Sequence, residues 1–571
     1  MSHAKKAEQC QCIVSRIEFW QEIRDNPTEG VPLRIAGEAD TPPTKTETKT
    51  SPLNAAFEKL VRDTLDRCHI PGVAVAVVDG DDTWTAGYGM AALPDVPVRP
   101  STLFFAGSTT KSFTAAAASL LVDDDTTEAR ARVQWTTPLS ELIREDFVLA
   151  DAYGTAHVTL EDALSHRTGL ATHQLTIGRR RSAPTAIRDY VRSLHHCAMT
   201  QPIRTAWQYC NGMFIAVGHM IEVVTGQTLG AFMKERLWTP LGMMSTFWTL
   251  AEAQAFVADG ANDTNGRRAT ATLAVPYAWD EAAGQHRAIP YFDGVLGGAG
   301  AIISTVEDYA AYLRCILRKT APLSAAGHAA LRQPRAFCPP GAQPQLTQPM
   351  TYSLGWMLST YRGDDVMLHP GGVEGMTATM VCVPARDWAV VVFANADSPG
   401  REAIAWHLVD ERLGVPAAAR LDVHEDAQAK QAWRQARHAG SRTRLYPTVP
   451  DPPRPLSLPR LHDYAGVYTH PACPDVVVSV DTDKGKDNDK ATPRLRADVT
   501  GALPVRLLLD HVTADYFVAG LYLFRHATVP DAMVKAEFQL DASGLVKRFG
   551  AAVDMFNPTG DLLWFEKQET A

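Results

Sequence analysis

The sequence has little cysteine, no excess of basic residues and no long apolar run. Its 571 residues include nine cysteines, an odd and sparse set that does not suit the disulfide framework of a secreted protein. Lys and Arg number 55 and Asp and Glu 64, so the net charge is −9, without the basic excess typical of nucleic-acid or membrane binders. No stretch approaches the roughly 18 apolar residues of a transmembrane helix. We therefore expect neither a nucleic-acid partner nor a membrane partner.

The first residues also lack a secretory pattern. They contain no apolar run of about 7–15 residues followed by small residues, so we expect no signal peptide. Together with the sparse cysteines, this predicts a reducing, cytoplasmic setting. Cys10 and Cys12 form a pair that could in principle bind a metal, but no second Cys/His pair follows at zinc-finger spacing. We interpret the pair as part of a polar tail and expect no metal site.

The composition is that of a globular protein of several domains. Apolar residues make up 46% and charged residues 21%, and roughly 100–200 residues per domain predicts two to four domains. Local composition and hydrophobic pattern divide the chain into a polar N-terminal extension (1–52), a main domain (53–415), a charged and Pro-rich linker (416–457) and a strand-rich C-terminal domain (458–571).

Within the main domain, helical and strand patterns alternate. The expected elements are a helix between Asn54 and Pro71-Gly72, a buried strand at Val73–Val78, a helix from Ser108, several helices over 155–240, two strands joined by the turn Pro384–Asp387, and a helix at Glu402–Leu413. Helices at both ends, strands inside and a helical middle predict α+β or α/β packing. The C-terminal domain predicts a small antiparallel sheet or barrel of about 110 residues.

A chemistry-bearing pattern, S-x-x-K, begins at Ser108 and ends at Lys111. Positions i and i+3 of a helix share one face, so the two side chains point to the same place. A serine hydroxyl needs a nearby base, and a lysine serves as one when burial lowers its pKa. The alternative interpretation is that Ser108 caps the helix and Lys111 is solvated.

Two phosphate-binding alternatives fail on spacing. A Walker loop needs glycine directly before the lysine, and Thr110 stands there. The GGAG stretch at Gly297–Gly300 lacks the G-x-G-x-x-G spacing and the acidic residue that follows in dinucleotide-binding proteins. We therefore expect no cofactor.

Two further patterns follow Ser108 by about 100 and about 260 residues: Y-x-N at Tyr209–Asn211 and H-x-G at His369–Gly371. In this order and spacing, the chain resembles the serine β-lactamase-related proteins, which include class C β-lactamases, penicillin-binding-protein-type peptidases, and esterases and acyltransferases. The likeness covers roughly residues 53–415, and LHDYAGVYTH resembles the start of the β domain appended to many fungal members. It implies an antiparallel sheet flanked by terminal helices, an all-helical subdomain and a barrel-like C-terminal domain.

The resemblance also assigns roles. Ser108 would be the nucleophile that becomes acylated, and Lys111 and Tyr209 would share proton transfer; which of the two removes the proton is left open. Asn211 would hydrogen-bond Lys111 or a substrate amide.

The H-x-G segment would complete the site. The backbone N–H groups of Ser108 and Gly372 would form the oxyanion hole, and Gly371 and Gly372 suit a backbone that must approach the substrate closely. His369 stands where many members have lysine. A neutral imidazole is a weaker partner for a β-lactam carboxylate, which favours esters, thioesters or lactones.

The sequence thus predicts a metal-free serine hydrolase that acts through an acyl-enzyme on a small-molecule or carrier-bound acyl substrate. Relatives in fungal biosynthesis release or transfer acyl chains, so secondary metabolism is an expected setting. An acyltransferase, a D-amino-acid peptidase or amidase and a non-catalytic scaffold are the alternatives, and a homo-oligomer is left open. All three patterns precede residue 377, so the C-terminal domain is expected to supply no essential catalytic group.

Overall fold

The computed structural model of the chain describes most residues beyond the N-terminal extension. The described residues are 49–124, 133–179, 185–261, 271–281, 283–339, 346, 349–420, 436, 438–482, 493–523, 529–553 and 561–569. The predicted extension up to residue 48, with Cys10 and Cys12, and much of the charged part of the linker lie outside them. From Ser51 onward the chain forms one compact unit.

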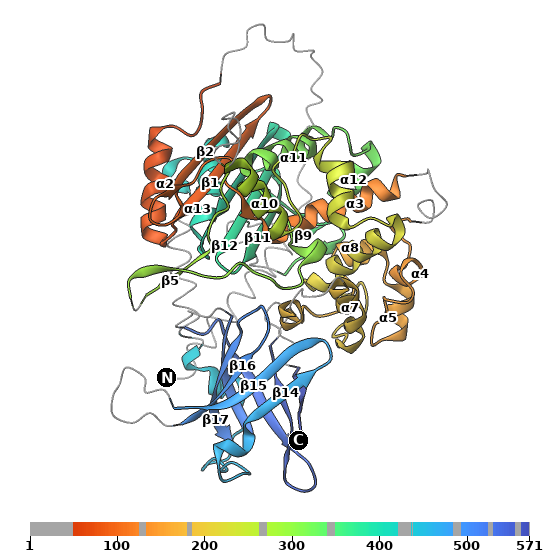
Figure 1. The fold of residues 1–571 in the computed structure, drawn as a ribbon, viewed down its shortest axis with the longest axis vertical. Helices are drawn as coiled ribbons and strands as arrows, with labels where there is room; N and C mark the ends of the chain where they lie inside the picture. Colours follow the sequence, from red (N-terminus) through yellow and green to blue (C-terminus); the bar gives the residue numbers. More distant parts are fainter. Residues whose placement is uncertain are drawn as a thin grey trace, which may run out of the picture. The chain divides into compact units, whose positions relative to one another are not determined.

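A nine-stranded antiparallel sheet forms the centre of the main domain (Figure 1). Its strands, in spatial order, are β3 (Val96–Pro97), β2 (Asp82–Ala92), β1 (Gly72–Asp79), β13 (Trp388–Ala394), β12 (Met376–Val383), β11 (Asp364–Val373), β10 (Met357–Tyr361), β9 (Thr351–Tyr352) and β8 (Ala336–Phe337). Two small sheets pair β4 (Phe104–Phe105) with β7 (Ile303–Ser304) and β5 (Tyr277–Asp280) with β6 (Gln285–Ala288).

Both faces of this sheet are covered. Val73, Val75 and Val77 of β1 join the core with α2 (Ala55–Cys68) and α13 (Gly400–Arg412). The alternating Ala74, Ala76 and Val78 join the core on the opposite face, with α3 (Thr110–Val122) and α11 (Val306–Arg318). Side chains of a strand alternate between faces, so a run of apolar residues is what a strand buried on both faces requires.

The local predictions for this region are confirmed. Asn54 caps α2 by accepting from the backbone N–H groups of Ala56 and Phe57. The predicted strand, the turn at Pro384–Asp387 and the closing helix all lie where the sequence placed them.

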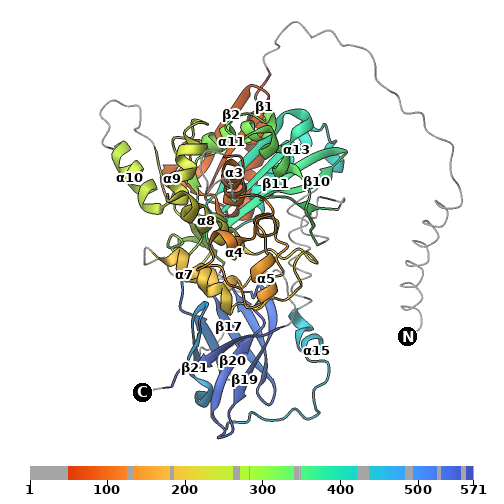
Figure 2. The same ribbon diagram turned by 90° about the vertical axis from the view of Figure 1, so that its right-hand side faces the viewer.

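A helical subdomain surrounds α8 (Asn211–Thr225), which contacts α3 as well as four of the short helices (Figure 2). The other helices here are α4 (Leu139–Leu142), α5 (Ala152–His157), α6 (Leu160–Leu164), α7 (Ala186–Ser193), α9 (Leu229–Met233) and α10 (Leu250–Ala261), and α12 (Ala325–Arg332) follows α11. All residues of α8 from Asn211 to Ile221 are buried, as expected of a helix with apolar residues on most faces.

The C-terminal domain is a closed eight-stranded antiparallel barrel, coloured blue in Figures 1 and 2. Its strands are β14 (Gly466–His470), β15 (Cys473–Asp481), β16 (Arg494–Val499), β17 (Arg506–Thr513), β18 (Tyr516–Tyr522), β19 (Ala532–Leu540), β20 (Val546–Ala551) and β21 (Leu563–Lys567); α15 (Ser441–Leu445) precedes them. Closure removes exposed sheet edges. The predicted barrel is confirmed.

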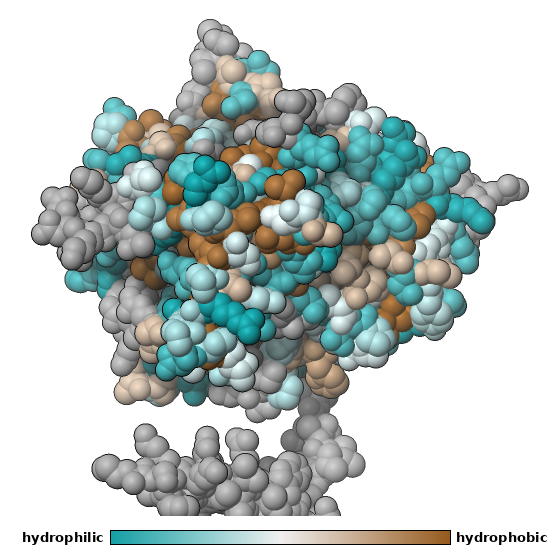
Figure 3. Space-filling view, turned by 90° about the horizontal axis from the view of Figure 1, so that it is seen from below, coloured by the Kyte–Doolittle hydropathy of each residue, from teal (hydrophilic) through white to brown (hydrophobic). Residues whose placement is uncertain are grey.

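Figure 3 shows one face of the molecule, on which hydrophobic surface gathers toward the middle and hydrophilic side chains surround it. Among the described residues, no helix is long and apolar enough to cross a bilayer.

Candidate active site

Ser108 lies on a tight turn directly before α3. The turn is a 3₁₀ helix, η1 (Gly107–Thr109), so the predicted helix from Ser108 starts as 3₁₀ and becomes α-helical at Thr110. Gly107 has φ +53°, and a Cβ there would lie 2.4 Å from the Gly372 nitrogen of β11. Only glycine fits this conformation and this close approach, which brings β11 against the serine.

The side chains of Lys111 and Tyr209 both contact the Ser108 hydroxyl. Lys111 Nζ lies 2.9 Å from Ser108 Oγ, and the Tyr209 hydroxyl lies 2.8 Å from the same atom. Ser108 itself is partly exposed. The structure therefore brings together the S-x-x-K and Y-x-N patterns, which are 101 residues apart, around one partly accessible oxygen.

Lys111 is fully buried, which excludes the solvated lysine of the alternative interpretation. Its Nζ donates to the Ala299 carbonyl oxygen at 2.8 Å and lies 4.8 Å and 5.5 Å from the ring centroids of Tyr209 and Phe214. Burial lowers the pKa of Lys111 well below its ordinary 10.5, against a smaller opposing effect of Cys210. This shift favours the neutral amine, which can accept a proton, more than in a solvated lysine.

The pKa of Tyr209 is shifted in the opposite direction from that of Lys111. Burial raises the pKa of its hydroxyl well above the ordinary value, and the hydrogen bond to Ser108 only partly offsets this. Tyr209 is therefore favoured as a neutral O–H donor. The backbone carbonyl of Tyr209 accepts a hydrogen bond from the Thr172 hydroxyl, and this bond helps to fix the position of the residue.

His166 holds the backbone on both sides of Tyr209. Its carbonyl accepts from Gln208 N–H at 2.8 Å, and its Nδ1 accepts from Cys210 N–H at 3.0 Å, where α8 begins. The ring lies 4.4 Å from the Tyr209 ring, and burial lowers the pKa of His166 well below its ordinary value. His166 therefore has a structural role, because it fixes the backbone of the two residues that flank Tyr209.

The H-x-G segment lies beside the serine. A Cβ on Gly371 would lie 2.1 Å from the Ala106 oxygen and 3.2 Å from the Ser108 nitrogen, so this position admits no side chain. Gly372 is exposed, next to the partly exposed Ser108. Asn211 begins α8 and is buried. Gly371 and Gly372 thus lie on β11, which adjoins η1, and Asn211 follows Tyr209 by two residues.

His369 on β11 is buried, and both of its ring nitrogens have partners within the protein. Nε2 lies 2.9 Å from the Tyr352 hydroxyl, and Nδ1 lies 2.6 Å from the Pro370 carbonyl. Because a carbonyl only accepts, Nδ1 carries the proton and Nε2 accepts from Tyr352. Burial, with the charge of Lys111, lowers the pKa of His369 to about 3. Its imidazole is therefore neutral at ordinary pH.

Sequence reasoning missed two partners of the predicted residues. The Ala299 carbonyl that binds Lys111 belongs to η5 (Gly297–Ala299), within the GGAG stretch that had been weighed only as a phosphate loop. The second is Tyr352, whose hydroxyl is the hydrogen-bond partner of His369. A backbone carbonyl has no side-chain signature, so only the fold identifies the first.

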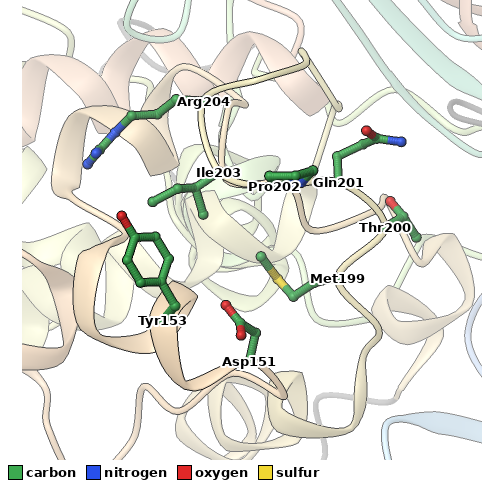
Figure 4. A pocket seen from close by; sticks show the side chains of 8 residues that line it. All are labelled: Asp151, Tyr153, Met199, Thr200, Gln201, Pro202, Ile203 and Arg204. Atoms are coloured by element: carbon green, nitrogen blue, oxygen red, sulfur yellow. The ribbon is translucent and has the colours of Figure 1, made fainter.

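A cavity of about 760 Å³ lies in the helical subdomain (Figure 4). It is lined by Asp151, Tyr153 and the six residues Met199–Arg204, so it does not include the Ser108 cluster. Thr200 on its wall accepts from the Gln208 side chain at 2.7 Å, one residue before Tyr209. The cavity and the reactive cluster are separate features.

No group of three or more His, Cys, Asp or Glu side chains suited to a metal ion occurs among the residues that the structure describes. None of the seven cysteines within those residues forms a disulfide: Cys68, Cys197, Cys210, Cys315, Cys338, Cys382 and Cys473.

Two protein-family models match the chain, one over the main domain and one over the C-terminal barrel. The beta-lactamase family model matches residues 57–413, and a domain of unknown function, DUF3471, matches 450–567. Two unguisins hydrolases, from Aspergillus campestris and Aspergillus violaceofuscus, are each 36% identical; they cover 92% and 91% of this chain, over 94% and 91% of their own lengths. The octameric penicillin-binding protein homologue from Pyrococcus abyssi has the same fold, with 17% identity and a TM-score of 0.55 over 90% of this chain and 99% of its own. The chain belongs to the beta-lactamase family, and its fold is that of a hydrolase of this family with an additional C-terminal β-barrel.

Proposed function

We propose that the protein is a serine hydrolase that forms an acyl-enzyme on Ser108. The observation that carries this proposal is the position of Ser108 Oγ, within hydrogen-bond reach of both Lys111 Nζ and the Tyr209 hydroxyl. A nucleophile next to a base that is itself fixed by a third group is the arrangement required for covalent catalysis. A scaffold would need none of these contacts.

Lys111 acts as the base in this mechanism. Its lowered pKa and the raised pKa of Tyr209 favour a neutral amine beside a neutral phenol. In that state Ser108 donates its proton to Lys111 Nζ, Tyr209 donates to Ser108 Oγ, and Lys111 donates to the Ala299 carbonyl. When Ser108 attacks the acyl carbon, its proton passes to Lys111 and the bond to the leaving group breaks. Tyr209 gives its proton to the leaving group and recovers one from Lys111. Water then attacks the acyl carbon, its proton returns to Ser108, and the acid is released.

The oxyanion forms between the backbones of η1 and β11. The N–H groups of Ser108 and Gly372 are the proposed donors, supported by the close approach of the Gly107 and Gly371 backbones to the opposite segment. Lys111 Nζ is bonded to Ser108 and Ala299, so we assign Asn211 to a substrate amide or carbonyl instead.

The substrate is an uncharged acyl compound: an ester, a thioester or a lactone. The neutral His369, bound to Tyr352 and Pro370, provides no cation for a substrate carboxylate. Similarity to two unguisins hydrolases along nearly the whole chain supports hydrolysis over acyl transfer, and it makes unguisins a second substrate class to test.

The test is a panel of p-nitrophenyl esters, acyl thioesters and unguisins, each with and without an added alcohol. We expect hydrolysis products from at least one class, little ester formation with the alcohol, and no turnover by folded Ser108→Ala. Turnover by Ser108→Ala at the wild-type rate would contradict the mechanism. A product dominated by the alcohol ester would instead make the protein an acyltransferase.

A further inference from the structure

Among the contacts between the barrel and the main domain, one is made by a short segment that leads to the Ser108 cluster. This segment is η2 (Gln174–Gly178). Leu175 is buried and belongs to the hydrophobic core of the barrel rather than to the core of its own domain. The neighbouring Arg179 donates to the Pro471 carbonyl of the barrel at 3.1 Å. A segment that places a side chain in another domain's core is held by that domain.

Two glycines make the contact close. Ala502 N–H of the barrel donates to the Gly178 carbonyl at 2.6 Å. A Cβ on Gly501 would lie 2.2 Å from the same carbonyl oxygen, and a Cβ on Gly178 would lie 3.1 Å from Leu503 Cβ. Contact of this kind leaves no room for even a methyl group on Gly501.

The segment continues to Tyr209 on one side. Thr172, two residues before η2, donates its hydroxyl to the Tyr209 carbonyl. Within η2, the Thr176 hydroxyl donates to the His173 carbonyl at 2.8 Å. It also lies 2.9 Å from the Tyr190 hydroxyl, and this hydrogen bond fixes the segment to α7.

On the other side, the segment continues to Lys111. Val295 N–H lies 3.2 Å from the Ile177 carbonyl and 3.1 Å from the Arg179 carbonyl. Four residues later, the Ala299 carbonyl accepts from Lys111 Nζ. The two groups that move protons at Ser108 are thus each connected to η2 through a few backbone contacts.

We propose that the C-terminal barrel is a positioning element of the active site: by holding η2 it fixes Tyr209 and the Lys111 environment, without contributing a catalytic residue. This rests on the proposed function, and it assigns a role to the domain matched by DUF3471. By holding η2, the barrel also supports the Val295–Ala299 segment that covers Lys111 Nζ, and burial of this kind favours the neutral amine.

The test compares two glycine-to-alanine variants of the full-length chain. Gly501→Ala forces the Gly178 carbonyl to move, whereas Gly440→Ala makes the same chemical change where no atom lies within 4 Å of the new methyl group. Leu175→Ala is a second variant, which loosens the same contact from the main-domain side. The readouts are the rate constant for acylation of Ser108 by p-nitrophenyl butyrate as a function of pH, and the thermal unfolding midpoint.

We expect Gly501→Ala and Leu175→Ala to acylate about tenfold to a hundredfold more slowly, because small displacements of catalytic groups have effects of that size. The pH midpoint of acylation should rise toward the ordinary lysine range as water reaches Lys111. Gly440→Ala should match wild type. Wild-type rates and pH midpoints in both variants, or an equal loss in Gly440→Ala, would overturn the proposal. If wild type itself is not acylated, the proposed function fails, which is a distinct result.

Discussion

The central sheet and the C-terminal barrel bury different kinds of residues. Around the sheet, the core of the main domain encloses Lys111, His166 and His369, three nitrogen-bearing side chains with lowered pKa values. The core of the barrel consists mostly of aliphatic side chains and a cluster of aromatic rings around Phe538, although it also buries the Cys473 thiol. Burying an ionisable group opposes folding, whereas burying an apolar ring favours it. The main domain therefore gives up stability around the proposed active site, whereas most of the side chains buried in the barrel favour folding.

The largest effect is expected at Lys111. Lys111→Met keeps a similar volume but removes the proposed base, so acylation should fall by at least about a thousandfold, within the range for general-base catalysis. The same variant should have a larger free energy of unfolding than wild type, because it no longer buries an ionisable amine. Stopped-flow acylation and urea titration measure the two effects. Loss of stability together with retained acylation would show that burial of Lys111 neither costs stability nor serves catalysis.

The stability gain should also depend on pH, with a definite sign. The pKa of Lys111 is lower in the folded chain than in the unfolded chain, so the unfolded chain binds more protons between the two values. The gain in Lys111→Met is therefore full below the folded pKa and shrinks as the pH rises toward 10.5. A gain that stays constant over this range would show that folding does not lower the pKa of the amine.

An apolar residue of the barrel should behave in the opposite way. Phe538 is buried, and its ring lies 5.0 Å from the rings of both Tyr464 and Phe549. Phe538→Ala should destabilise the barrel by about 3–5 kcal/mol, the usual range for such a cavity. Differential scanning calorimetry measures the loss. An unchanged unfolding free energy would mean that the barrel core is not packed as described.

A smaller effect is expected in substrate choice. A missing charge-assisted hydrogen bond weakens a contact by roughly 1.5–3 kcal/mol, or about one to two decades in rate constant. Because His369 is neutral, we expect kcat/KM for a p-nitrophenyl butyrate ester to exceed that for nitrocefin by at least this factor. Arg167 does not readily replace the cation, since it pairs with Glu161 and Asp162. Nitrocefin as the better substrate would contradict the carboxylate argument.

The smallest expected effect is the absence of a histidine step in the pH profile. The pKa of His369 is lowered to about 3, so its ring stays neutral from pH 5 to 9 in the folded chain. Acylation should rise with pH in a single step assigned to Lys111, at a midpoint below 10.5. His369→Gln should retain this step. Its disappearance in that variant would assign the titration to His369.

Local patterns predicted much of this molecule because local physics determines it. The i, i+3 spacing placed Ser108 and Lys111 on one face, and the valine run of Val73–Val78 specified a strand buried on both sides. The Ala299 carbonyl and the Tyr352 hydroxyl could not be found in this way. Each meets its partner only through tertiary packing, and a carbonyl is common to every residue. The contact between η2 and the barrel has no pattern in the sequence either.

Mass spectrometry of the intact chain during turnover tests the central claim most directly. After rapid mixing with p-nitrophenyl butyrate and an acid quench, wild type should gain the mass of one butyryl group. Peptide mapping should place that group on Ser108, and the adduct should decay as butyrate is released. The Ser108→Ala variant should gain no mass. An adduct on another residue, or butyrate release by Ser108→Ala at the wild-type rate, would contradict the account.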